Sequence, residues 1–233
     1  DTGYVTGVTA VAMTSKSLTG LTATHAANVT VAGDQSTAFT VALAAATGTS
    51  DVLTMTMGTG LTTGASFDVA GLVMTGFETA NLVSNPGPTA TVGANQTVTL
   101  TVLTGATLAN VNLTGNAFAI TSADTTVAVA IDASALTGDN TAAGSKGLAI
   151  GATTFATGSV VTGSALIDSV ILDAGTEGVT LNLGAGADSI TADVATLVAD
   201  GTNDVTFNGG AGTDTVTVTN ATITMTDNHF TSI

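Results

Sequence analysis

Cysteine is absent from the 233-residue chain, which excludes disulfides, thiolate chemistry and cysteine-based zinc sites. Arginine is absent too, and only Lys16 and Lys146 oppose 17 acidic residues. Phosphate binding and attraction to anionic lipids both need Lys and Arg. The net charge of −15 therefore argues against nucleic acid and against direct insertion into an anionic membrane.

Large side chains are scarce as well: 44% of the residues are hydrophobic, but only 3% are aromatic and none is Trp. A wide core needs large side chains, whereas a thin layered core can be filled by Val, Ala, Leu and Ile. No run of 18 apolar residues or signal-peptide pattern is present. The chain begins at Asp1 and stops in mid-pattern at Ile233, so we expect a piece of a longer protein.

Threonine and glycine are abundant, with 50 Thr and 28 Gly. Apolar residues alternate with Thr or Asn in many short segments, for example residues 98–102, 127–131, 179–183 and 215–219. This period of two, broken by Gly, Asn and Asp, predicts β-strands joined by tight turns. Both prolines of the chain fall in residues 86–88, which divide an N-terminal β region (1–85) from a β-solenoid (89–233).

One motif carries chemistry. Residues 209–217 (GGAGTDTVT) match the calcium-binding β-helix repeat G-G-x-G-x-D-x-U-x, where U is a large aliphatic residue, at every specified position. Glycines allow the turn to direct carbonyl oxygens inward, and Asp214 adds a carboxylate. Because calcium needs six to eight oxygens, a neighbouring turn must complete the site.

That neighbour is residues 183–191 (LGAGADSIT), which lack only the first glycine. A third, eroded copy, residues 163–171 (GSALIDSVI), keeps Asp168 and the aliphatic position but lacks two glycines. The aspartates are 20 and 26 residues apart rather than nine, which predicts a solenoid with long rungs and calcium turns on one edge. Asp204 and Asp51 are further candidate ligands, each between a turn and a strand. The alternatives are Gly-rich hairpin turns with Asp as a turn former, and solvated turn aspartates at Asp204 and Asp51.

The chain resembles the RTX-containing surface-layer (S-layer) proteins of Gram-negative bacteria, of the Caulobacter type. The similarity rests on residues 46–52, 76–82 and 131–138 and on the two glycine turns, in the order that such proteins show. It implies calcium-stabilised β-solenoid domains, type I secretion, and self-assembly into a lattice on the outer surface. Cell-surface polysaccharide would be a second partner, bound through another domain.

The resemblance also implies a ligand set for Ca²⁺ in which backbone carbonyls act with aspartate carboxylates. Together with the further candidates above, the expected metal residues are Leu183, Gly184, Ala185, Gly186, Asp188, Gly209, Gly210, Ala211, Gly212, Asp214, Asp168, Asp204 and Asp51.

Catalytic signals are weak. His25 and His229 are the only histidines and neither has a partner at ligand spacing. Glu78 is expected to satisfy a local backbone amide or to end a strand. No nucleotide-binding or serine-hydrolase motif occurs. We therefore expect an all-β, extracellular, calcium-dependent structural protein and not an enzyme. An RTX adhesin or biofilm-matrix protein, and the calcium-binding tail of a secreted hydrolase, are the alternatives.

Overall fold

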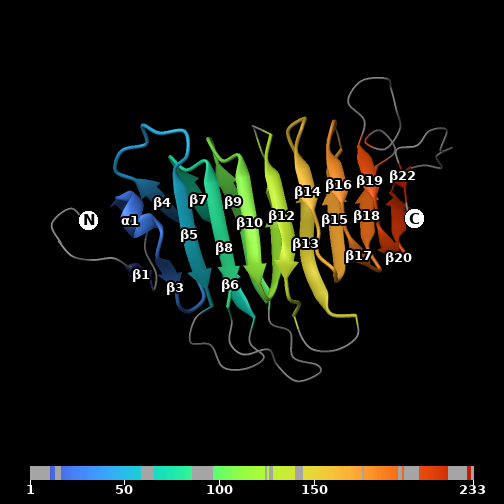
Figure 1. Ribbon diagram of the computed structural model, residues 1–233, viewed down its shortest axis with the longest axis horizontal. Helices are drawn as coiled ribbons and strands as arrows, with labels where there is room; N and C mark the ends of the chain where they lie inside the picture. Colours follow the sequence, from blue (N-terminus) through green and yellow to red (C-terminus); the bar gives the residue numbers. More distant parts are fainter. Residues whose placement is uncertain are drawn as a thin grey trace.

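The computed structural model describes residues 11–13, 17–58, 66–85, 97–123, 125, 128–139, 144–174, 176–193, 196, 205–219 and 230–231. Within them the fold is built almost wholly of β-strands, with one four-residue helix, α1 (Ala23–Ala26). The strands lie across the long axis of the molecule and follow one another along it in chain order (Figure 1). The fold is therefore all-β, as the alternating sequence pattern predicted.

Two large sheets form the walls of the fold. The first contains, in order, β1 (Val11–Met13), β3 (Val29–Val31), β5 (Val52–Met57), β8 (Thr79–Ser84), β10 (Asn110–Gly115), β12 (Ala130–Leu136), β14 (Val160–Thr162), β16 (Thr180–Asn182), β19 (Thr206–Asn208) and β22 (Phe230–Thr231). The second contains β2 (Leu18–Leu21), β4 (Phe39–Leu43), β7 (Leu72–Thr75), β9 (Thr97–Gly105), β11 (Ala117–Ser122), β13 (Lys146–Thr153), β15 (Ile167–Leu172), β18 (Ser189–Ala192) and β21 (Thr215–Val218), with β6 (Phe67–Val69) pairing β9 beside this path.

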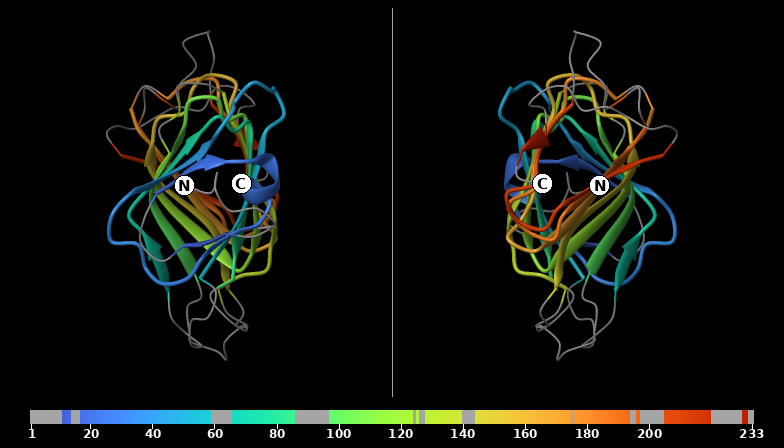
Figure 2. Two further views of the ribbon diagram at one scale, coloured as in Figure 1. Left: turned by 90° about the vertical axis from the view of Figure 1, so that its left-hand side faces the viewer. Right: turned by 90° about the vertical axis from the view of Figure 1, so that its right-hand side faces the viewer.

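The chain passes from one sheet to the other and back, and the pairs between neighbouring rungs are parallel, as between β16 and β19 and between β18 and β21. Successive turns of the chain superpose when the molecule is seen from its ends (Figure 2). The architecture is therefore a parallel two-sheet β-solenoid. Residues 86–88 lie outside the described residues, and β8 and β9 on either side of them belong to the same two sheets.

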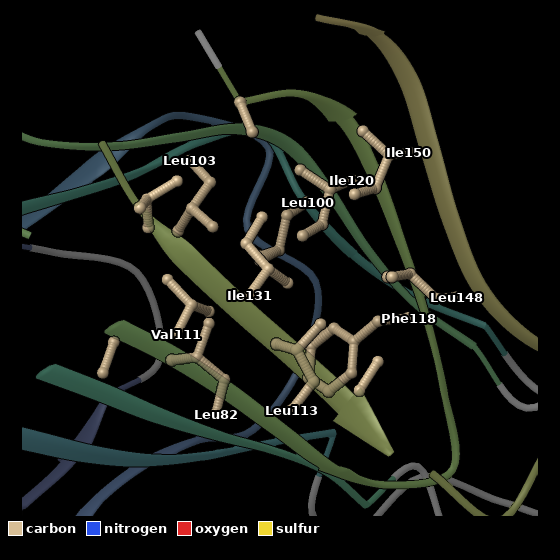
Figure 3. Close-up of a cluster of buried hydrophobic side chains, with 14 of the residues drawn as sticks. Leu82, Leu100, Leu103, Val111, Leu113, Phe118, Ile120, Ile131, Leu148 and Ile150 are labelled. Atoms are coloured by element: carbon tan, nitrogen blue, oxygen red, sulfur yellow. The ribbon is translucent and has the colours of Figure 1, made fainter. Parts of the chain in front are cut away.

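The core lies between the two sheets and is thin. Inward-facing residues stack from rung to rung; Leu181 is paired with Phe207, for example, and both are fully buried. Leucine, valine and isoleucine side chains from both sheets meet around Phe118 in the middle of the coil (Figure 3). Met55 and Met57, two residues apart in β5, are fully buried on one face, as their strand spacing predicted. Medium-sized side chains thus fill a layered core that needs few aromatics.

Outward-facing polar residues also stack in register. Nδ2 of Asn112 donates a 2.8 Å hydrogen bond to Oδ1 of Asn81, whose own Nδ2 donates to Oγ1 of Thr54 at 3.4 Å. The Thr and Asn residues that alternate with the core positions therefore connect neighbouring rungs on the outside of the coil. Alternation along the strand and stacking across strands together define one rung of the solenoid.

Candidate metal centre

Three buried aspartates form a column along one edge of the C-terminal rungs. Asp168 lies in β15, while Asp188 and Asp214 directly precede β18 and β21. The backbone N–H of Asp168 donates to Oδ1 of Asp188 at 2.8 Å, and the N–H of Asp188 donates to Oδ1 of Asp214 at 2.9 Å. The sequence separations of these pairs, 20 and 26 residues, are one rung each, which confirms the long-rung interpretation of the aspartate spacing.

The two glycine turns stack directly on one another. Residues 185–186 and 211–212 form the short strands β17 (Ala185–Gly186) and β20 (Ala211–Gly212), which pair in parallel at the C-terminal end of the coil (Figure 1). The N–H of Ala211 donates to the carbonyl of Gly184 at 2.8 Å. The structure thus brings together the two turns that the sequence predicted to be halves of one site.

Glycine is required in the second turn for two reasons. Gly210 and Gly212 have φ of 90° and 143°, a region in which side chains are strained. A Cβ on Gly210 would also lie 1.8 Å from the carbonyl oxygen of Gly184, and one on Gly212 would lie 1.6 Å from that of Gly186. Carbonyl oxygens of one turn therefore approach the backbone of the next turn in a space that no side chain could share.

The carboxylates of Asp188 and Asp214 are only half satisfied. Asp188 is 1% exposed and Asp214 is 6% exposed, so water cannot solvate them freely. Oδ1 of each accepts a backbone hydrogen bond, as described above, whereas Oδ2 of each is buried without a hydrogen-bond partner. A buried carboxylate oxygen without a partner is costly unless a donor or a cation pairs with it.

The pKa of Asp188 shows the same imbalance. Burial, and the neighbouring carboxylates of Asp168 and Asp214, raise its pKa from 3.8 to about 6, against the lowering effect of the hydrogen bond from the Asp168 amide. Burial also raises the pKa of Asp168, while the amides of Leu148 and Ser164 and the Ser164 hydroxyl lower it. The column therefore concentrates negative charge that it does not itself neutralise.

These features fit a calcium ion. Calcium prefers hard oxygen ligands in flexible numbers, and carboxylates and backbone carbonyls are what the stacked turns contain. Leu183, Gly184, Ala185, Gly186 and Asp188 lie in one turn, and Gly209, Gly210, Ala211, Gly212 and Asp214 lie in the next. Among the described residues, no three His, Cys, Asp or Glu side chains cluster as a metal site by themselves. Carbonyl oxygens would therefore have to supply most ligands, as in the predicted motif.

Two of the three remaining predicted ligands, Asp168 and Asp51, do not join this pair of turns. Asp168 lies one rung earlier, and both of its carboxylate oxygens accept hydrogen bonds from Ser164. Asp51 directly precedes β5 of the first sheet, whereas the aspartates of the column lie in or directly before strands of the second sheet. Asp204 lies outside the described residues.

The residue that contacts Asp51 is Glu78, whose Oε2 accepts the Asp51 backbone N–H at 2.8 Å. Glu78 therefore does satisfy a backbone amide, but that amide lies on the neighbouring rung, 27 residues away, and is not the local one that the sequence suggested. Oδ2 of Asp51 is buried without a partner, but the residue as a whole is only partly buried. An unpartnered carboxylate oxygen thus occurs here too, but without the stacked glycine turns of the candidate metal centre.

An apolar cavity of about 560 Å³ lies elsewhere, beside the end of β9 that pairs with β7 rather than with β6 and β11. Met74, Leu103, Leu108, Val111 and Ile131 are among its lining residues, none of which is ionisable. In the described part of the chain, the lining of this cavity is therefore made of apolar side chains, threonines and glycines, with no titratable group.

Comparison of the chain with protein-family models, with curated proteins and with solved structures finds no match. Within the described residues, no helix has the length and apolar character needed to cross a membrane.

Proposed function

We propose that this chain is a calcium-dependent structural protein of an extracellular bacterial surface layer, where it assembles with copies of itself into a lattice. The observation that carries the proposal is the pair of unpartnered, buried Oδ2 atoms of Asp188 and Asp214 on stacked glycine turns. Calcium supplies the positive charge that this edge of the solenoid lacks. The two turns and their carbonyl oxygens would hold the ion.

Calcium binding is then coupled to folding. Two unit charges roughly 5 Å apart at an effective dielectric constant of about 20 repel by about 3 kcal/mol, and the unfolded chain avoids this repulsion. A divalent ion converts that repulsion into attraction only in the stacked state, so its binding free energy becomes folding free energy. In the calcium-poor cell interior the C-terminal rungs would stay open for type I secretion. Outside the cell they would fold.

A lattice role accords with the shape and the chemistry of the chain. The solenoid is elongated (Figure 1). Asn and Thr side chains of neighbouring rungs stack on its outer face, as at Asn112, Asn81 and Thr54. Strand edges at the ends of a parallel coil can pair with further strands. The resemblance to S-layer proteins adds the surface layer as the place of assembly, with cell-surface polysaccharide as a partner of another domain.

Two measurements test the proposal. Circular dichroism and thermal unfolding in calcium and in EGTA should show a cooperative gain of β-structure and a higher melting temperature with calcium, with magnesium as the control ion. An unchanged spectrum and melting temperature would refute the calcium role. Electron microscopy of the native cell surface should then show a regular array. Adhesion to a specific partner without an array would favour an RTX adhesin or biofilm-matrix protein instead.

A further inference from the structure

The rungs of Asp168 and Asp188 carry different residues at one equivalent position, which the stacking of their turns identifies. The Ala185 amide, next to Gly184, donates to the carbonyl of Ser164 at 3.3 Å, and a Cβ on Gly184 would lie 2.2 Å from that same oxygen. Ser164 therefore stands in the turn of Asp168 where Gly184 stands in the turn of Asp188. The two aspartates are themselves one rung apart.

Ser164 satisfies the carboxylate of Asp168 completely. Its backbone N–H donates to Oδ2 of Asp168 at 2.6 Å, and its hydroxyl Oγ lies 3.0 Å from both Oδ1 and Oδ2. Oδ1 also accepts the N–H of Leu148, at 2.5 Å. Asp168 is fully buried and yet none of its oxygens lacks a donor.

The next two rungs lack the hydroxyl donor that Ser164 provides. Gly184 and Gly210 have no side chain to offer, and Oδ2 of Asp188 and of Asp214 is left buried and unpartnered. The three aspartates of the column are buried to a similar degree. The carboxylate of Asp168 receives a hydrogen bond from a serine hydroxyl, whereas the equivalent position beside Asp188 and Asp214 is a glycine, which has no hydroxyl to donate. Comparison with the rung of Asp168 therefore shows which partner the carboxylates of Asp188 and Asp214 lack.

We infer that Ser164 takes the place of the metal ion at Asp168, so that the calcium-binding column begins at Asp188 and the rungs before it are stable without calcium. This inference deepens the proposed function and depends on it. The fourth motif position supports the same inference. Leu166 stands there in the turn of Asp168, where Gly186 stands in the turn of Asp188, and the Leu166 N–H donates to Ser164 Oγ at 3.2 Å. The turn of Asp168 is therefore filled by protein groups.

Hydrogen exchange on the whole chain separates the two halves of the column. In wild-type protein, EGTA should lower the protection of amides in β18 and β21 by about a hundredfold relative to calcium at 100 times its dissociation constant. Amides in β13 and β15 should change little. Equal loss of protection in both regions would refute the serine inference while leaving the calcium role intact.

A pair of substitutions at one position tests the cause. Ser164→Gly removes the hydroxyl donor and opens the turn, so calorimetric titration with calcium should show one additional bound ion, and protection of β15 should become calcium-dependent. Ser164→Ala removes the same hydroxyl but keeps Cβ in the turn, so it should lower stability equally in calcium and EGTA without adding an ion.

The outcomes are distinguishable. A Ser164→Gly chain that binds as many ions as wild type, with β15 still insensitive to EGTA, would overturn the assignment of Ser164. A wild-type chain that binds no calcium at all would instead overturn the calcium proposal, and the serine inference with it.

Discussion

The backbone N–H of Asp188 donates a 2.9 Å hydrogen bond to Oδ1 of Asp214, one rung further along the coil. One oxygen of the Asp214 carboxylate thus joins two rungs, while the other, Oδ2, is buried and unpartnered. The Asp214 side chain can therefore contribute to stability with and without a metal ion, through two different atoms. The two contributions can be separated by experiment.

Asp214→Ala should destabilise the chain by about 2 kcal/mol in EGTA, because it leaves the buried Asp188 amide without its charged acceptor. In calcium the loss should be larger, since the ion also loses a ligand. Denaturant unfolding in both conditions measures the two losses. Asp132→Ala removes the same charge from an exposed position and is the control. An equal loss with and without calcium at Asp214, or an equal calcium response in Asp51→Ala, would contradict the assignment of the site.

Gly210→Ala should prevent the two glycine turns from stacking. Its φ of 90° disfavours a side chain, and the new Cβ would meet the Gly184 carbonyl at 1.8 Å. Gly33→Ala is a matched control, because Gly33 also has φ of 90° but has no atom within 4 Å of the added Cβ. Gly33→Ala should cost about 1 kcal/mol from backbone strain alone. Gly210→Ala should cost more and abolish the calcium response in thermal unfolding; equal effects of the two would argue against close stacking.

Stability should depend on pH in opposite directions with and without calcium. In EGTA the native state holds a proton on Asp188 up to about pH 6, whereas the unfolded chain releases it near 3.8. The native state therefore binds more protons in this window, and stability falls as pH rises from about 4 to 6. The raised pKa of Asp168 adds to this trend.

With calcium the trend should reverse, because the ion binds only the ionised carboxylate. Calcium affinity should fall by about tenfold for each pH unit below 6, as one proton competes for Asp188. Calorimetric titrations from pH 5 to 8 check this. Asp188→Asn, which cannot ionise, should reduce the pH dependence in EGTA to the part that Asp168 contributes. An unchanged slope would assign the dependence to groups other than Asp188.

Glu78→Ala should lower stability by about 1 kcal/mol, because the Asp51 amide loses the carboxylate that accepts its hydrogen bond. The loss should be the same in calcium and in EGTA, since this hydrogen bond lies away from the stacked glycine turns of the candidate metal centre. Glu177→Ala, at the other glutamate and at an exposed position, is the control. A loss that depends on calcium would instead identify a second metal site beside Asp51.

Much of this fold follows from local patterns in the sequence. Alternation such as Thr215-Val216-Thr217-Val218 identifies a half-buried strand, and the spacing of Asp168, Asp188 and Asp214 equals the rung length because the same turn recurs once per rung. Scarce aromatics correctly indicated a thin core. These features are visible because a solenoid repeats its local geometry along the chain.

Contacts between rungs of unequal length were not predictable. The hydrogen bond from the Asp51 amide to the Glu78 carboxylate joins residues 27 positions apart, and nothing in either segment identifies the other as its neighbour. In the sequence, Ser164 is recognisable only as a position where the motif has lost a glycine. A serine four residues before an aspartate carries little information in a chain with so many small polar residues. Its value as a donor becomes visible only when Asp168 and Asp188 are compared in the same column.

The stacking of rungs has a consequence for size. Neighbouring strands advance by roughly 4.8 Å along the long axis whatever the number of residues in the turn that joins them. Rungs of 20 and 26 residues therefore add the same length along that axis. The number of rungs therefore sets the length of the coil. Loops between the strands can gain or lose residues without changing that length.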